Sequence, residues 1–101
     1  MYRNGMRASH PGEILRKEYL EPLELSAAAL ARAICVSAPT VNDIVRGRRG
    51  ITADIALRLS IAFGNNAEFW MNLQSAYELR LAEKAKGAQI RANIKPLDSV
   101  A

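Results

Sequence analysis

Apolar residues recur along most of the chain at the three- and four-residue intervals of an amphipathic helix. The clearest run covers residues 53–63, where they follow the i, i+1, i+4, i+7, i+8 pattern of a buried helix face. Thr52 stands where an N-cap is needed, and Gly64 where a C-cap is needed. The pattern as a whole predicts an all-α fold with five helices. They are expected over residues 11–19, 27–34, 38–46, 53–63 and 67–85.

Turn-forming residues set the limits of the first three helices. Pro11 suits a first helical turn, where its missing N–H costs nothing. The helix should end before Pro22, which leaves residues 20–25 as a linker. Ser26 and Ser37 each precede an apolar run and are N-cap candidates for the second and third helices.

The longest predicted helix, residues 67–85, carries an apolar stripe wide enough to contact more than one neighbour. It starts after Asn65 or Asn66 and should end before Gly87. We therefore expect this helix to form a homodimer contact. The candidate interface residues are Trp70, Leu73, Tyr77 and Leu81, of which Trp70 also suits the core.

The last part of the chain follows a different pattern. Residues 89–95 alternate apolar and polar side chains at period two, which is typical of a strand, and Pro96 would end it. Because a helical domain offers no sheet, this segment is either a frayed tail or a short strand that pairs with another chain. The predicted organisation is a flexible arm at 1–9, a helical domain at 10–86 and a tail at 87–101.

Composition narrows the classes of function. The 101 residues suffice for one compact domain, and a net charge of +4 permits nucleic-acid binding without requiring it. No apolar run approaches the roughly 18 residues of a membrane span, and no signal peptide is present, so we expect a cytoplasmic protein. With one cysteine, Cys35, and one histidine, His10, we expect no disulfide, metal or cofactor. No nucleophile–base set points to an enzyme.

Two of the predicted helices have the spacing of a helix-turn-helix motif, at about residues 27–46. They are eight or nine residues long, a short turn containing Cys35 joins them, and the small Ala31 lies where they would cross. The loop that follows concentrates cations at Arg46, Arg48 and Arg49. A helix beside such a cluster suits a major groove flanked by phosphates. From the spacing alone, a helical hairpin with a solvated basic turn explains the same pattern.

Five blocks of sequence carry a more specific pattern. They are HPGEIL at residues 10–15, LEPL at 20–23, GRRGITAD at 47–54, AEFWMNLQ at 67–74 and AYELR at 76–80. In order and spacing, they resemble HigA-type antitoxins of the helix-turn-helix (lambda-repressor-like, XRE) family over about residues 10–84. The resemblance implies a five-helix lambda-repressor-like DNA-binding domain. It also implies three partners: double-stranded operator DNA at the protein's own promoter, a second copy of the chain, and a HigB-type toxin that cleaves messenger RNA.

Carried over to this sequence, the family's recognition helix falls on residues 38–46. Chemically, Asn42 suits adenine, Asp43 suits the N4 amine of cytosine, and Ala38 or Thr40 suits a thymine methyl group. The arginines suit phosphate oxygens, and Ser37 suits a phosphate at the helix N-terminus. The candidate DNA-binding residues are Ser37, Ala38, Pro39, Thr40, Asn42, Asp43, Arg46, Arg48 and Arg49.

Three positions depart from the family pattern. Cys35 stands where glycine is usual, and a left-handed backbone costs a non-glycine residue about 1 kcal/mol. Ala27 replaces a glutamine that clamps a phosphate, and Asp43 brings a negative charge toward DNA. Together with Pro39, the last two leave open a protein-interaction module that has lost DNA binding. A stand-alone repressor without a toxin is the other alternative.

Overall fold

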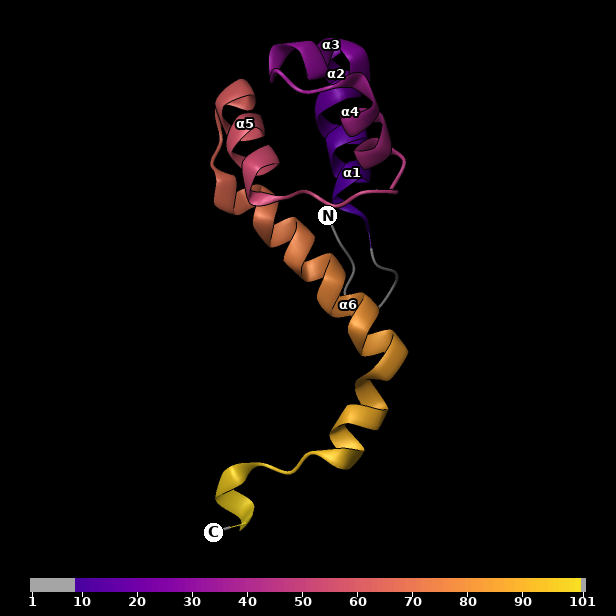
Figure 1. The fold of residues 1–101 in the computed structure, drawn as a ribbon, viewed down its shortest axis with the longest axis vertical. Coiled ribbons are helices and arrows are strands. Elements are labelled where there is room, and N and C mark those ends of the chain that lie inside the picture. The colour runs from indigo at the N-terminus through magenta and orange to yellow at the C-terminus, as the bar shows by residue number, and fades with distance from the viewer. Residues whose placement is uncertain (1–8, 101) are drawn as a thin grey trace.

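The computed structural model describes residues 9–100, and this part of the chain is built of helices (Figure 1). The elements are α1 (Pro11–Ile14), the π-helical η1 (Leu15–Leu20), α2 (Glu21–Leu23), α3 (Ala27–Ala33), α4 (Ala38–Val45), α5 (Ala53–Phe63), α6 (Ala67–Asn93) and the 3-10 turn η2 (Leu97–Val100). Since α1, η1 and α2 follow one another directly, they form a first rod, and the all-α prediction with five helical rods is confirmed. Of the arm predicted at residues 1–9, all but Ser9 lies outside the described residues.

The predicted N-caps are confirmed by their hydrogen bonds. The side-chain oxygens of Ser26, Ser37 and Thr52 lie 3.0, 3.4 and 3.3 Å from the backbone nitrogens three residues further on. Asn66 caps α6 in the same way at 2.7 Å. Gly64 ends α5 in the left-handed conformation, with φ of 70°. Local side-chain chemistry therefore fixes where four of the rods begin.

The prediction that the first helix ends before Pro22 is wrong. The rod continues through α2 and ends at Glu24, whose φ is 52°, so the expected linker at residues 20–25 is helical as far as Leu23. A proline in an α-helix clashes with the carbonyl oxygen four residues earlier. The N–H of Glu21, the C-cap residue of η1, instead donates to the carbonyl of Arg16, five residues earlier. This wider turn displaces the carbonyl and accommodates the proline.

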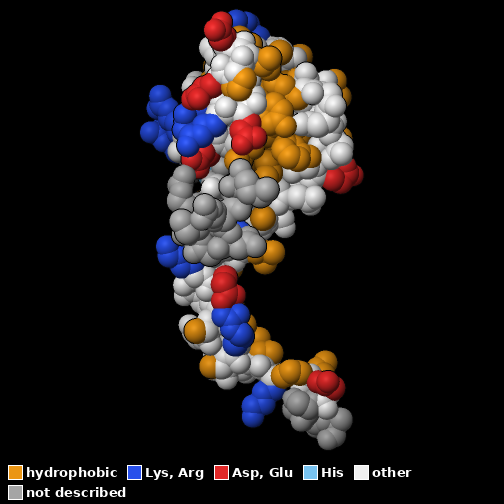
Figure 2. Space-filling model, turned by 180° about the vertical axis from the view of Figure 1, so that it is seen from behind, with side chains coloured by type: hydrophobic (Ala, Val, Ile, Leu, Met, Phe, Trp, Pro, Cys, Tyr) orange, Lys and Arg blue, Asp and Glu red, His pale blue; other side chains and the backbone are white. Residues whose placement is uncertain are grey.

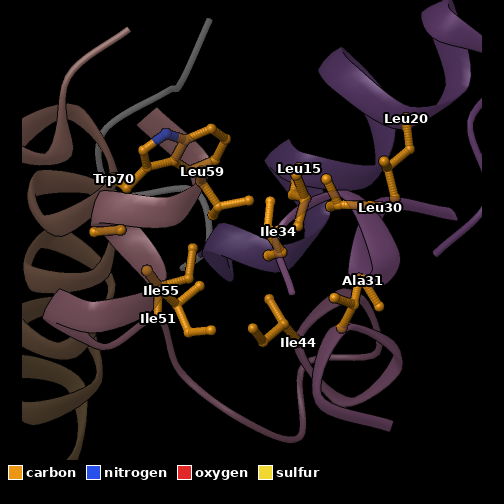
Figure 3. Close-up of a cluster of buried hydrophobic side chains, with 12 residues drawn as sticks. Leu15, Leu20, Leu30, Ala31, Ile34, Ile44, Ile51, Ile55, Leu59 and Trp70 are labelled. Atoms are coloured by element: carbon orange, nitrogen blue, oxygen red, sulfur yellow. The ribbon is translucent and has the colours of Figure 1, made fainter. Parts of the chain in front are cut away.

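The core lies where the first rod and the α3–α4 pair meet α5 and the start of α6. Figure 3 shows Leu59 and Trp70 on one side of this core and Leu15 and Leu30 on the other. Trp70 is fully buried, and its indole N–H donates to Oδ1 of Asn65 at 2.9 Å. The expected place of Trp70 in a dimer interface is therefore corrected, because its own domain already covers the side chain.

α6 continues to Asn93, so the strand that was one of the two alternatives for residues 89–95 is wrong, as is the helix end before Gly87. α6 runs through Gly87 without a break. The flanking alanine, lysine, glutamate and glutamine residues are strong helix formers, which outweigh one glycine. Glu83 and Arg91 form an ion pair across Gly87, where an added Cβ would meet both side chains.

The helix ends because of Pro96 rather than Gly87. Ile94 has an extended backbone, with φ of −117° and ψ of 130°, and stands two residues before the proline. Figure 1 shows the second half of α6 projecting away from the globular part, which gives the molecule extents of 56 × 25 × 23 Å. Within residues 9–100, we find no helix with both the length and the apolar character to cross a membrane.

Candidate nucleic-acid interface

The turn between α3 and α4 has the geometry of a helix-turn-helix. Cys35 is left-handed, with φ of 62°, so this residue adopts the conformation that usually requires glycine. The N–H of Val36 donates to the carbonyl of Ala31 at 2.9 Å and closes the turn. Ala31 is fully buried between the two helices. The predicted departure at Cys35 is thus absorbed with the turn intact and the thiol exposed.

The inner face of α4 is fixed by its contact with α1. Val41 and Ile44 are fully buried. The backbone of Gly12 approaches so closely that an added Cβ would lie 1.7 Å from the carbonyl oxygen of Ile44. This glycine therefore lets the first rod rest directly against the end of α4. With its inner face held, α4 turns its opposite edge outward.

The structure places all nine candidate DNA-binding residues at or near the surface. Ser37, Pro39, Arg46, Arg48 and Arg49 are exposed, and Ala38, Thr40, Asn42 and Asp43 are half-buried. They form one continuous edge that runs from the N-terminus of α4 into the loop at residues 47–50. Ala38 also packs against the core, so part of its surface is already covered.

Hydrogen bonds within this edge hold several of its side chains in place. The Ser37 and Thr40 hydroxyls lie 2.8 Å apart. Nδ2 of Asn42 donates to the carbonyl of Ala38 at 3.1 Å. Its amide keeps a second hydrogen and its own oxygen, which is the donor–acceptor pair that adenine recognition needs. Asp43 Oδ2 lies 3.6 Å from Arg49 Nη2, so part of the negative charge is balanced by the loop itself.

The basic loop is anchored to α6 by a buried glutamine that the sequence analysis missed. Gln74 is 7% exposed, and its Oε1 accepts from the backbone N–H of Ile51 at 2.7 Å. Its Nε2 donates to Glu78 at 2.8 Å. Gly50 passes so close that an added Cβ would lie 2.8 Å from Nε2 of Gln74. The signal in the sequence is a polar residue four positions after Trp70, on the buried face of the helix.

His10 holds the loop from the other side. Its Nδ1 accepts from the N–H of Gly12 at 2.9 Å and so caps the first rod, while its ring packs edge-on against Tyr77 with 4.9 Å between centroids. Burial lowers the pKa of His10 below its ordinary value of 6.5, although a hydrogen bond with the backbone of Arg49 acts in the opposite direction. The neutral imidazole thus links the first rod, the loop and α6.

The arrangement can present an eight-residue helix edge and three guanidinium groups to one anionic surface. In Figure 2, lysine and arginine side chains gather at one edge of the globular part, beside acidic ones. Direct base reading needs side chains on a helix that fits the major groove, and affinity needs cations at phosphate distance. The outward edge of α4 supplies the base-reading side chains, and the arginines beside it supply the cations.

Comparison with known proteins identifies helix-turn-helix proteins, including antitoxins, as similar to this chain. A helix-turn-helix family model matches residues 17–70. Over 84 residues the chain is 58% identical to virulence-associated protein I of Dichelobacter nodosus, covering 83% of this chain and 78% of that protein. It is similar to the solved Pseudomonas aeruginosa antitoxin HigA with the higBA promoter, at 60% identity and a TM-score of 0.88, over 90% of this chain and 99% of that one. Antitoxin GraA in complex with its operator is 52% identical, with a TM-score of 0.86, over 96% and 98% of the two chains.

Proposed function

Because this chain belongs to the helix-turn-helix family and is of the HigA antitoxin type, we propose that it is the antitoxin of a toxin–antitoxin module. It binds operator DNA at its own promoter, represses transcription there and neutralises a HigB-type toxin that cleaves messenger RNA. One observation carries the proposal. The outward edge of α4 and its three neighbouring arginines belong to a chain whose relatives, HigA and GraA, have been solved with promoter and operator DNA.

In this function α4 enters the major groove of the operator. A groove about 12 Å wide admits one helix, and the outward side chains of α4 face the base edges. Asn42 reads adenine, while Arg46, Arg48 and Arg49 grip phosphates on either side. Ser37 meets a phosphate at the N-terminus of α4, where the helix dipole favours an anion.

The dimer contact is proposed on α6. Leu73 and Tyr77 are half-buried near the globular part, and Leu81 is 44% exposed. Ala85, Ala88 and Ala92 continue from Leu81 at intervals of four, three and four residues, which extends one apolar face of small side chains. All three are exposed. Two copies joined along this face present two α4 edges to half-sites about 34–36 Å apart.

An antitoxin needs a DNA-binding unit and a surface that binds the toxin. Residues 10–86 are the DNA-binding unit, and residues 87–93 of the tail at 87–101 extend the dimer helix. The candidate toxin-binding surfaces are the N-terminal arm, the first rod and residues 89–95. A protein that represses a bacterial promoter works in the cytoplasm. Purification together with the product of the adjacent gene distinguishes an antitoxin from a stand-alone repressor.

The test of DNA binding is the salt dependence of operator affinity. The variant Arg46→Ala/Arg48→Ala/Arg49→Ala should bind the shared promoter more weakly. The slope of log K against log salt should flatten by about 1 for each lost phosphate contact. The matched control, Arg16→Ala/Lys17→Ala/Lys95→Ala, removes the same charge elsewhere and should keep the wild-type slope. Equal slopes for all three proteins would exclude the loop from the interface.

A further inference from the structure

A single arginine on α5 reaches across to the turn of the helix-turn-helix. Nη1 of Arg58 donates to the carbonyl of Ile34 at 2.8 Å and to that of Cys35 at 3.3 Å. Its Nε donates to Oδ1 of Asp54, one turn earlier on α5, at 2.7 Å. The side chain is 39% exposed, so it spans the surface between the two elements. The guanidinium therefore has one end fixed on α5 and the other on the turn.

The turn needs a donor at this point. The last carbonyls of a helix have no partner within the helix and lie at the negative end of its dipole. Ile34 is the C-cap residue of α3, and Cys35 follows in the left-handed conformation. A planar cation with several fixed N–H groups satisfies two successive carbonyls and matches the sign of the helix end.

The position of the link matters because of how the helices are paired. The most extensive contacts of the described chain are α3 with α4 and α5 with α6. Arg58 is a polar connection between these two pairs, at the turn that determines where α4 starts. The other end of α4 rests on Gly12, so α4 is supported at both ends.

We propose that Arg58 is a positioning residue for operator recognition: by tying the α3–α4 turn to α5, it fixes the orientation of α4 in the groove without itself contacting DNA. Asp54 holds the guanidinium in the required direction. This inference rests on the proposed function, because an orientation of α4 has a measurable effect only if α4 reads DNA. Loss of the link leaves Arg46, Arg48 and Arg49 in place and alters only the orientation of the outward edge of α4.

The experiment measures affinity for the operator and for random-sequence DNA over a range of salt, well below the melting temperature of each variant. Arg58→Ala should weaken operator binding about tenfold, the size of one lost base contact. Random-DNA affinity should stay within about twofold and the salt slope unchanged, because both report phosphate contacts. Arg58→Lys, with a cation that reaches the carbonyls, should restore part of the operator affinity. Asp54→Asn should lower it less than Arg58→Ala does.

The control is Arg16→Ala, which removes an arginine whose ion pair with Glu21 at 2.8 Å stays within the first rod. It should leave both affinities unchanged. Equal weakening on both DNAs with a flatter slope would show that Arg58 touches phosphate and would overturn the inference, as would unchanged operator binding by Arg58→Ala. If Arg58→Ala does not fold, the same comparison is made with Arg58→Lys and Asp54→Asn. A wild-type protein that does not prefer its operator would instead overturn the proposed function.

Discussion

Gln74 is the buried polar group that the structure uses to hold the basic loop, and its replacement by methionine tests this role. Methionine keeps the length and volume of the side chain, so the change removes hydrogen bonds without opening a large cavity. The backbone N–H of Ile51, a residue 2% exposed, then loses its acceptor at 2.7 Å. A buried donor left unpaired costs about 1–3 kcal/mol. For a chain of this length that lowers the melting temperature by roughly 4–8 °C per kcal/mol.

The assay is urea unfolding at one fixed protein concentration, because the stability of the proposed dimer would depend on concentration. Glu78→Ala is the matched control, since it removes only the outer, solvent-facing partner of Gln74 and should cost less than about 0.5 kcal/mol. We also expect Gln74→Met to weaken promoter binding, because the loop that carries the arginines loses its anchor on α6. If the free energy of unfolding of Gln74→Met lies within about 0.5 kcal/mol of wild type, or if Glu78→Ala lowers it as much, Gln74 does not anchor the loop.

Two further predictions concern the first rod. Gly12→Ala should lower the free energy of unfolding by about 3 kcal/mol in urea titrations, because its Cβ would lie 1.7 Å from the backbone oxygen of Ile44. Helix propensity alone predicts the opposite, because alanine favours a helix more than glycine does. A Gly12→Ala protein that is more stable than wild type would therefore contradict the close contact. For His10 the folded pKa lies below 6.5, so the neutral form contributes stability that is complete above that pH and is lost as pH falls through the folded pKa. Unfolding titrations from neutral to acidic pH should therefore show a smaller loss in His10→Asn, which keeps a cap acceptor. If the free energy of unfolding falls equally with pH in wild type and in His10→Asn, groups other than His10 cause the loss.

The parts of the fold that the sequence predicts are those decided within a few residues. Ser26, Ser37 and Thr52 cap helices because a hydroxyl three residues before an N–H has the right reach in almost any context. The exposed edge of α4 was equally predictable, since Val41 and Ile44 set its buried face. Local geometry determines both features.

The features that the sequence did not predict depend on partners distant in sequence or on competing local preferences. Pro22 stops an ordinary helix, yet here η1 widens ahead of it. Gly87 resembles a stop signal, but its neighbours favour helix and an ion pair crosses it. Alternation over residues 89–95 indicates a strand only where another strand is present to pair with it. The tie from Gln74 to Ile51, 23 residues apart, has no local signature beyond one polar residue in an apolar face.

The two halves of α6 differ in what keeps them folded. The first is locked by Trp70, whereas every described residue from 81 to 93 except Gly87 is exposed. Bare helical turns of this length are only marginally stable in water and open far more often than a core does. Among residues 9–100 of an isolated subunit, we therefore expect a protease to cut the backbone beyond Arg80 before the core helices. We therefore expect a molecule that covers this stretch to slow cleavage of the chain.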